Sequence, residues 1–597
     1  MSLEAPHSLS DAGLDSRPFA GAAGCGCPVC AGQAVVLDDG VAATPLAYLN
    51  ADERSGTTVN GKQSFSIDRA GLQMTGFNPA TMEPYPGWGG TAGQAYTVTY
   101  AFRATAPLNM PSDTEGFQRF NSTQMFAAEQ AMLAWSDVAR ITFVRVGSGF
   151  EGEGAYSDNA SILLGNYTSG QSGASAFANY PGNPAASSAA GDVWVNITAG
   201  TNAIPTPGNF GYHTLVHELG HAIGLAHPGD YNAGENDSAP ITYANNAEYF
   251  EDSRQYTVMS YFSEANTGAS YGGRLAAAPQ LDDIRAAQIE YGANMTTRTG
   301  DTVYGFNSTA QRDWFLAQNS SSRLVFAVWD AGGADTFDFS GYSNNQLIDL
   351  REGFFSNVGG LVGNVAVAQG AQIENAIGGF GADTMNGNAL ANILTGGAGA
   401  DRIFAGAGGD TIDGGSGSGF LRGEDGDDSI VGGASFDDIQ GNTGNDTESG
   451  GGGDDWVVGG KDNDRLFGDD GSDVVFGNLG DDSVDGGAGN DTVRGGQGDD
   501  TLAGGAGADF VSGDRGSDSM VGGAGADLFH TSADAGIDSV FDFSIAEGDR
   551  VMLDPGTPFS VAQVGGDVVI TLGSAADRMI LVGVQLSALP EGWIFGA

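Results

Sequence analysis

Cysteine, positive charge and long apolar runs are all scarce in this sequence. Its 597 residues include 3 Cys, all between Cys25 and Cys30, so the rest of the chain has no cysteine to form a disulfide. Lys and Arg number 23 against 74 Asp and Glu, which gives a formal net charge of −51. This charge repels nucleic-acid phosphates and anionic lipids, and it makes divalent cations the expected counter-charge. No apolar run reaches the ~18 residues that span a bilayer, so we expect no transmembrane segment.

A Sec signal peptide is also missing, because the N-terminal region shows no basic stretch followed by an apolar stretch. Residues 1–45 have no hydrophobic periodicity, and we expect them to form a loose leader or pro-segment. An exported protein without disulfides needs another stabilising element, and bound metal is the candidate.

Glycine, by contrast, is abundant and concentrated. The chain has 98 Gly, more than twice the usual share of about 7 %. A collagen-like period of three is absent, and the hydrophobic content of 41 % does not fit general disorder. From Gly378 to His530 the chain instead follows the nonapeptide G-G-x-G-x-D-x-(apolar)-x through 153 residues. The sixth position is Asp in every unit except those with Asn392 and Gly419.

A nonapeptide is too short to bury its one apolar side chain alone, so successive units must stack into a parallel β-roll. Glycine turns expose carbonyl oxygens and the Asp carboxylates add hard anionic ligands, a combination that suits Ca²⁺. Without Ca²⁺ we expect this region to be largely unfolded. The alternative is a glycine-rich solenoid or acidic linker that binds no ion. The expected Ca²⁺ ligands are Asp335, Asp383, Asp401, Asp410, Asp428, Asp437, Asp446, Asp455, Asp464, Asp473, Asp482, Asp491, Asp500, Asp509, Asp518 and Asp527.

The region before the repeats has the pattern of a mixed α/β domain. Alternation predicts a strand over Tyr96–Phe102, and helical spacing runs from Met125 to Ala139. Further short strands are expected from Ile141, at Ile162–Leu164 and at Val193–Ile197, and a helix over His213–Leu225. We therefore expect four parts: a leader (1–45), an α/β domain (46–295), a β-roll domain (296–535) and a C-terminal cap (536–597).

The strongest chemical signal is a histidine motif in the expected helix. His217 and His221 are four residues apart, so both imidazoles lie on one helical face and can reach one Zn²⁺. His227 supplies a third ligand, and three protein ligands leave a position open for water, as in catalytic zinc sites. Glu218 lies between the first two histidines, where it can act as general base on that water.

The residues around this motif make it more specific. Gly224 allows the chain to leave the helix, and Pro228 prevents the helix from resuming. The sequence TVMSY, with Met259, follows at the distance of a Met-turn, and this long form is typical of metzincin proteases. A structural histidine cluster without protease chemistry is the alternative. His213 matches no ligand position and is expected beside the metal site or at the surface.

Beyond these motifs, the chain resembles the serralysin family, calcium-dependent secreted metzincins with a C-terminal RTX β-roll, from about Val59 to Val551. The resemblance implies that Tyr261 is an additional zinc ligand that swings away to stabilise the oxyanion, and that Met259 forms an apolar floor under the metal. It also implies that an edge strand, Ser175–Phe177 or Gly191–Trp194, holds the substrate as an added strand. The stretches that carry it are VNGKQSFSIDRAG from Val59, TLVHELGHAIGLAHPGDYN from Thr214, EDSRQYTVMSYFSEANTG from Glu251, RTGDTVYGFNST from Arg298 and FAVWDAGGADTFDFSGYS from Phe326.

The expected function is therefore that of a secreted zinc endopeptidase that cleaves proteins and peptides. The resemblance implies export by type I secretion machinery that reads a C-terminal signal, and Glu591–Phe595 matches that signal except for two further residues, Gly-Ala. A proteinaceous inhibitor and attachment to the cell surface are further expectations, and nucleic acid is not an expected partner. The main alternative is an RTX adhesin or surface-layer-associated protein whose metzincin domain is inactive or processes only itself. A zinc hydrolase for a substrate other than peptide is a second alternative.

The cysteine cluster departs from the family pattern. Cys25, Cys27 and Cys30 lie in the expected pro-segment. One hypothesis is a latch in which a thiolate occupies the fourth zinc position until the segment is removed. An accessory metal or redox cluster, or an unpaired surface patch, are the alternatives.

Overall fold

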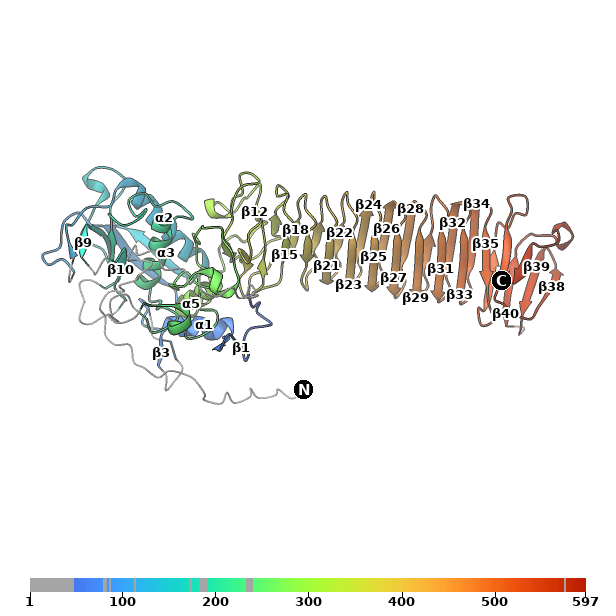
Figure 1. The fold of residues 1–597 in the computed structure, drawn as a ribbon, viewed down its shortest axis with the longest axis horizontal. Helices are drawn as coiled ribbons and strands as arrows, with labels where there is room; N and C mark the ends of the chain where they lie inside the picture. The colour runs from blue at the N-terminus through green and yellow to red at the C-terminus, as the bar shows by residue number, and fades with distance from the viewer. Residues whose placement is uncertain are drawn as a thin grey trace.

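The computed structural model describes residues 48–78, 83–84, 87–111, 114–170, 174–181, 190–231, 240–573 and 576–596. An α/β unit is followed along the long axis by an extended stack of parallel strands (Figure 1). This arrangement confirms the fold class expected from the sequence. Within the described ranges, no helix is both long and apolar enough to cross a membrane. The leader 1–45, with Cys25, Cys27 and Cys30, lies outside the described residues.

A five-stranded sheet forms the centre of the α/β unit, in the order β10-β11-β8-β5-β7. Strands β11, β8, β5 and β7 are parallel, and β10 pairs antiparallel with β11 at one edge. Every strand predicted in this region is present. The bounds are β5 Tyr96–Phe102, β7 Ile141–Arg145, β8 Ile162–Tyr167, β10 Ala176–Ala178 and β11 Val193–Asn196. Short pairs add β1 Thr58–Val59, β2 Lys62–Gln63, β3 Phe77–Asn78, β4 Glu83–Pro84, β6 Thr114–Glu115 and β9 Ser169–Gly170.

The helices bring the histidine motif onto this sheet. Helix α3 begins three residues earlier than predicted because the Asn209 side chain accepts the backbone N–H of Tyr212 (2.9 Å) and caps it. It also ends three residues earlier, at Ala222. Helix α2 packs against it, and the Trp135 indole donates to the Val216 carbonyl (3.0 Å). The bounds are α1 Ile67–Thr75, α2 Ser122–Val138, α3 Phe210–Ala222, α4 Tyr243–Asn246 and α5 Leu281–Tyr291, with 3₁₀ turns at Glu153–Ala155, Glu264–Thr267, Asp313–Phe315 and Leu586–Ala588.

Two long sheets, of 15 and 12 strands, form the β-roll, and successive strands of the repeat region alternate between them. Paired strands are 18 residues apart, as Ile412 opposite Ile430 shows, so one coil comprises two nonapeptides. The apolar residue of each repeat, such as Ile412 or Val457, lies buried between the sheets. The nine-residue period therefore predicts the inward face, whereas the structure shows that every second unit, not each successive one, is paired in a sheet.

The strands of the roll are short and regular. The larger sheet comprises β12 Val303–Gly305, β14 Thr336–Asp338, β18 Asn375–Ile377, β20 Ile393–Thr395, β22 Thr411–Asp413, β24 Ser429–Gly433, β26 Thr447–Gly452, β28 Arg465–Asp470, β30 Ser483–Asp485, β32 Thr501–Gly507, β34 Ser519–Gly525, β36 Ile537–Val540, β40 Asp577–Leu581, β39 Asp567–Leu572 and β38 Phe559–Val564. The smaller comprises β15 Leu347–Asp349, β19 Thr384–Asn386, β21 Arg402–Ala407, β23 Phe420–Asp425, β25 Asp438–Thr443, β27 Trp456–Lys461, β29 Val474–Leu479, β31 Thr492–Gln497, β33 Phe510–Arg515, β35 Leu528–Thr531, β37 Arg550–Leu553 and β41 Ile594–Gly596. A third sheet holds β13 Phe326–Val328, β17 Val365–Val367 and β16 Phe355–Ser356.

The parallel stack continues beyond the last nonapeptide. Strand β36 pairs with β34, and β37 pairs with β35, but Ser519 faces Ser539 and Leu528 faces Arg550, so the turns here are longer. The boundary expected at residue 535 thus falls inside two continuous sheets, because the turns lengthen without a change of fold. An antiparallel hairpin of β38 and β39 closes the larger sheet.

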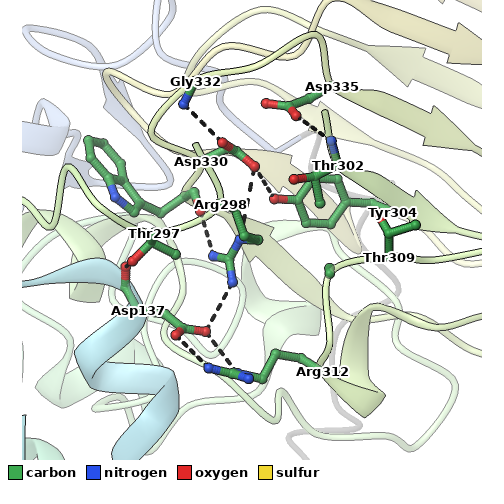
Figure 2. A network of polar contacts seen from close by, with 12 residues as sticks. Asp137, Thr297, Arg298, Thr302, Tyr304, Thr309, Arg312, Asp330, Gly332 and Asp335 are labelled. Carbon is green, nitrogen blue, oxygen red and sulfur yellow. Dashed lines mark hydrogen bonds and ion pairs between the residues drawn. The ribbon is translucent and has the colours of Figure 1, made fainter. Parts of the chain in front are cut away.

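A polar network joins the α/β unit to the roll (Figure 2). Asp137, near the end of α2, accepts from Arg298 (3.0 Å) and from two nitrogens of Arg312 (2.8 and 3.0 Å). A second contact comes from the start of the described chain, where the Ala51 N–H donates to the Gly353 carbonyl (3.2 Å). The α/β unit is therefore attached to the first coils at more than one place.

Candidate metal centres

Three buried histidines meet at one end of α3. His217 and His221 project from the helix one turn apart, and His227 lies beyond it. The chain reverses at Gly224, whose φ of +119° is a conformation that favours glycine. The three possible ligand nitrogens lie within 4.8 Å of one another. The structure therefore brings together the three histidines expected to bind zinc.

The hydrogen bonds of these rings leave the same nitrogen facing the centre in each. Nδ1 of His217 contacts the Val258 carbonyl (2.8 Å), Nδ1 of His221 contacts the Leu225 carbonyl (2.7 Å), and Nδ1 of His227 contacts the Tyr231 carbonyl (3.0 Å). A carbonyl only accepts, so each Nδ1 carries the proton and each Nε2 of a neutral ring presents a lone pair.

These lone pairs point at one another. Nε2 of His227 lies 3.1 Å from Nε2 of His221 and 3.4 Å from Nε2 of His217. Burial, followed by the neighbouring His227 and His217, holds the pKa of His221 well below its ordinary value, so the ring stays neutral. Nitrogen lone pairs that converge in a buried site repel one another unless a cation lies between them. Histidines that bind zinc are commonly anchored in this way, with the other ring nitrogen bonded to a carbonyl. The donor set fits Zn²⁺.

The Met-turn lies under this centre. A Cβ atom on Gly220 would come within 2.5 Å of Sδ of Met259, so only glycine at this helix position leaves room for the methionine. Val258, whose carbonyl anchors His217, is itself held by Asp283 on α5: its N–H donates to Oδ2 (2.7 Å), and the Thr257 hydroxyl donates to Oδ1 (2.6 Å). Burial raises the pKa of Asp283 to about 6. Sequence reasoning missed Asp283, and its only signal was an Asp in the first turn of a helix.

Glu218 and Tyr261 both lie at the centre. Glu218 occupies α3 between the two helical histidines and is fully buried. The ring of Tyr261 lies edge-on to that of His227, with centroids 4.4 Å apart, and 6.2 Å from that of His217. The structure thus brings a buried carboxylate and a phenol ring close to the three histidines.

Three residues near the histidines were not expected. The ring of Tyr231 stacks on His227 at 5.4 Å and 13°, and its hydroxyl donates to Asp252 (2.7 Å), which also accepts from Ser260. Burial raises the pKa of Asp252 to about 7. Tyr180 lies edge-on to His221 at 5.4 Å. Tyr231 follows His227 by four residues, but its spacing matches no ligand pattern, and Tyr180 and Asp252 reach the site only through the tertiary fold.

The fold decides between the alternatives left open for His213 and for the substrate strand. His213 is fully buried, and its Nδ1 contacts the Ala276 carbonyl (3.1 Å), so the surface alternative is wrong. Of the strands, β10 (Ala176–Ala178) lies at the sheet edge next to α3, whereas β11 (Val193–Asn196) lies inside the sheet. The candidate Gly191–Trp194 is therefore wrong, because both sides of its strand are already paired.

A second set of possible metal ligands follows the roll. Each repeat Asp uses Oδ1 to accept the backbone N–H of the residue 18 positions earlier, as Asp455 does from Asp437 (2.8 Å) and Asp473 does from Asp455 (2.7 Å). The other oxygen, Oδ2, is buried and accepts no hydrogen bond from the described residues. This holds for Asp401, Asp410, Asp428, Asp437, Asp446, Asp455, Asp464, Asp473, Asp482, Asp491, Asp500, Asp509, Asp518 and Asp527.

In many repeats the orphaned oxygen lies near a backbone carbonyl. A Cβ atom on Gly450 would lie 2.6 Å from Oδ2 of Asp455 and 2.8 Å from the carbonyl oxygen of Gly468, one coil onward. Carboxylate and carbonyl oxygens thus converge at a point that only glycine leaves open. Burial of acceptors without donors is unfavourable, and hard oxygen ligands in this arrangement suit Ca²⁺.

Two of the expected Ca²⁺ ligands, Asp383 and Asp335, differ from the other repeat aspartates in their hydrogen bonds. Both oxygens of Asp383 accept backbone N–H groups, from Gln346 and Gly379 (2.7 Å each), so this side chain is already satisfied. Asp335, at the network of Figure 2, uses Oδ1 for the Thr302 N–H (2.8 Å) and keeps Oδ2 orphaned. The repeat aspartates that accept a backbone N–H from an earlier coil form a series, the aspartate ladder. It continues at Asp549, which accepts the Asp527 N–H (3.0 Å). The longer turns after His530 hid Asp549 from the nine-residue period.

Comparisons with known proteins find relatives of both parts of the chain. A model described as peptidase M10 serralysin C terminal matches residues 293–554, and a model of metallo-peptidase family M12 matches residues 121–270. Serralysin C of Dickeya chrysanthemi is 48 % identical over 336 residues, which are 56 % of this chain and 66 % of the relative. Metalloprotease AprA of Pseudomonas entomophila is 46 % identical over 349 residues, 57 % of this chain and 68 % of the relative. Serralysin G of Dickeya chrysanthemi is 43 % identical over 349 residues, which are 57 % of this chain and 68 % of the relative.

The match thus spans a little under two thirds of the length of Serralysin C. A solved structure, that of the extracellular lipase LipA from Serratia marcescens, covers 37 % of this chain and 40 % of its own at 19 % identity. Its TM-score of 0.17 is too low to support an inference.

Proposed function

The chain belongs to the serralysin family, and on this premise we propose that it is a secreted zinc endopeptidase that hydrolyses proteins, with a roll folded by Ca²⁺. The observation that carries the proposal is the convergence of three neutral Nε2 lone pairs, each ring anchored through Nδ1 to a carbonyl. Such a set binds a metal and leaves a position open for water.

The chain's own residues supply the remaining chemistry. His217, His221 and His227 hold the metal, and a bound Zn²⁺ supplies Lewis-acid polarisation of water and of the scissile carbonyl. Glu218 accepts the proton of the attacking water and passes it to the leaving amine. Tyr261 donates a hydrogen bond to the developing oxyanion. The free edge of β10 is the candidate place for the substrate to add as a strand.

Calcium has a structural role in this proposal. The orphaned Oδ2 atoms of the repeat aspartates are close to glycine carbonyls of the next coil, and the net charge of −51 opposes folding without cations. We therefore expect folding of the roll to be linked to Ca²⁺ binding.

The C-terminal segment is proposed to carry the export signal for type I secretion machinery. Ile594 and Phe595 pair with Val551 and Met552 in the smaller sheet. In the folded roll this pairing engages Ile594 and Phe595, whereas Glu591 stays exposed. A proteinaceous inhibitor and cell-surface attachment stay predictions.

Casein digestion with metal removal tests the proposed activity. We expect a zinc chelator to abolish digestion by the protein kept in Ca²⁺, and added Zn²⁺ to restore it. Digestion that persists without zinc would contradict the proposal. If no digestion occurs even after residues 1–45 are removed, the adhesin alternative is favoured.

A further inference from the structure

One strand of the roll places an acid where its neighbours place an apolar residue. In β26 the inward position is Glu448, whose partners on the adjacent strands are Ile430 and Leu466. All three side chains are buried, and Glu448 is fully inaccessible to solvent. A carboxylate inside an apolar core is unfavourable unless it is paired.

Glu448 has no such partner in the described protein: neither Oε1 nor Oε2 accepts a hydrogen bond that meets normal geometry. The backbone N–H of Gly441 and the charge of Arg422 lower its pKa, but burial outweighs both and holds the pKa well above its ordinary value. The guanidinium of Arg422 is occupied, because it donates to Asp438 (2.8 Å). The described residues therefore offer Glu448 neither a hydrogen bond of normal geometry nor an unpaired guanidinium.

Glu448 points toward the aspartate ladder. A Cβ atom on Gly441 would lie 2.1 Å from Oδ2 of Asp446 and 2.4 Å from Oε1 of Glu448, so the two oxygens converge on one side of this glycine. At the equivalent Gly450 the same point meets one aspartate oxygen and a carbonyl, with no second carboxylate. The coil at Glu448 thus carries one more anionic oxygen than the repeat does.

A third carboxylate lies nearby, although it is not close enough to both of the others to share one ion with them. Asp464, one coil onward, accepts the Asp446 N–H through Oδ1 (2.9 Å), and its Oδ2 is a buried acceptor without a donor among the described residues. Both aspartates act electrostatically on Glu448. Glu448 and Asp446, whose oxygens converge, repel each other when ionised, and a hard divalent cation between them removes this repulsion and supplies the missing contacts.

We propose that Glu448 adds a second carboxylate to the Ca²⁺ site of Asp446 inside the roll, and that this site binds Ca²⁺ more tightly than the repeated sites. The inference rests on the proposed binding of Ca²⁺ by the roll and goes beyond it, because the nonapeptide pattern assigns no ligand to this position. Charge count and rigidity set Ca²⁺ affinity, so the additional carboxylate gives this coil the first ion to bind.

Calcium titration of the full-length protein tests the site. After chelation, binding is followed by isothermal titration calorimetry and by Tb³⁺ luminescence in wild type, Glu448→Leu and Glu448→Gln. Leu restores the apolar residue of the neighbouring strands, so this variant is expected to fold. Both variants should lose the tightest class of site or weaken it at least tenfold. Glu424→Gln, which changes an exposed carboxylate of β23, should leave the titration unchanged.

Two outcomes would overturn the proposal. If Glu448→Leu binds as many ions with the same affinity as wild type, Glu448 is a buried neutral acid. In crystals of the wild-type protein soaked with Tb³⁺, an anomalous peak within coordination distance of the Glu448 carboxylate is expected, and its absence would also refute the site, whatever the folding of the variants. A wild-type protein that binds no Ca²⁺ would instead contradict the calcium role under the proposed function.

Discussion

At the scale of single residues, Asp283 connects α5 to the histidine centre without lying among the ligands. It accepts from Val258, Thr257 and Gln280 and so holds the carbonyl that anchors His217. Asp283→Ala leaves these donors unpaired, and we expect the free energy of unfolding to fall by about 3 kcal/mol. We expect zinc affinity to fall roughly 10- to 100-fold, as for other lost supports of metal ligands.

Thermal unfolding and chelator competition measure the two effects of Asp283→Ala. Asp283→Asn is the matched control, because one amide oxygen can still accept both N–H groups and should restore most of the stability. Zinc affinity equal to that of wild type in the Ala variant would show that the support is dispensable.

Tyr261 provides a second residue-scale prediction. Its ring lies 4.4 Å from that of His227, and its hydroxyl is the proposed donor to the oxyanion. Tyr261→Phe keeps the ring and removes that donor, so we expect kcat to fall about 100-fold with little change in KM. Steady-state kinetics on a peptide substrate measure both constants. A raised KM with unchanged kcat would assign Tyr261 to substrate binding instead.

The sequence predicted the three histidines well because their spacing is a local property of a helix and its end. The groups that orient them were not predicted: Val258 and Asp283 reach the centre only through the tertiary fold, and Tyr231 follows His227 by four residues without matching a ligand pattern. Glu448 was likewise not predicted to be a ligand, because the nine-residue pattern assigns an apolar residue to its position and the repeat was read from the majority of units.

At the scale of elements, the strands of the Ca²⁺-free roll should respond to pH. Burial raises the pKa of Asp437 to about 7 and that of Asp464 to about 8, above the roughly 3.9 of Asp in an unfolded chain. The folded roll therefore holds protons more tightly than the unfolded chain does. This contribution to stability is fully present below about pH 4 and is lost as the pH rises through the folded pKa values.

Far-UV circular dichroism of the chelated protein between pH 4 and 9 measures this dependence. We expect strand content to increase on acidification. In excess Ca²⁺ the ionised carboxylates bind metal, so strand content should be high at neutral pH. Strand content independent of pH in the chelated protein would contradict the account.

Regular elements were more predictable than their ends and neighbours. The repeated turn and inward side chain follow from the nonapeptide, whereas the coil of two units, 18 residues, is known only from the strand pairing. Helix α3 was displaced by three residues because the Asn209 cap outweighed the periodic pattern. Which of two candidate strands forms the sheet edge depended on topology, which periodicity does not contain.

At the scale of the whole molecule, Asp137 links the α/β unit to the roll through Arg298 and Arg312 (Figure 2). Nothing in the sequence predicted this contact between the two parts. Asp137→Asn removes the charge that pairs with both arginines, and we expect about 2 kcal/mol less stability. Ca²⁺ should then raise the melting temperature of the α/β unit less than in wild type.

Differential scanning calorimetry with and without Ca²⁺ measures this coupling. The control is Asp313→Asn, because Asp313 is an exposed acid close in sequence to Arg312. Equal Ca²⁺-dependent shifts in wild type and Asp137→Asn would show that other contacts, such as that of Ala51 with Gly353, transmit the stabilisation.

The most direct test of the central claim is casein digestion by the protein in Zn²⁺ and Ca²⁺, beside Glu218→Gln. Glu218 is buried on α3 between two histidines that hold the metal, so Gln should preserve the zinc content while removing the general base. We predict equal bound zinc and a loss of activity of roughly 10²- to 10⁴-fold. Digestion by Glu218→Gln at the wild-type rate would contradict the account.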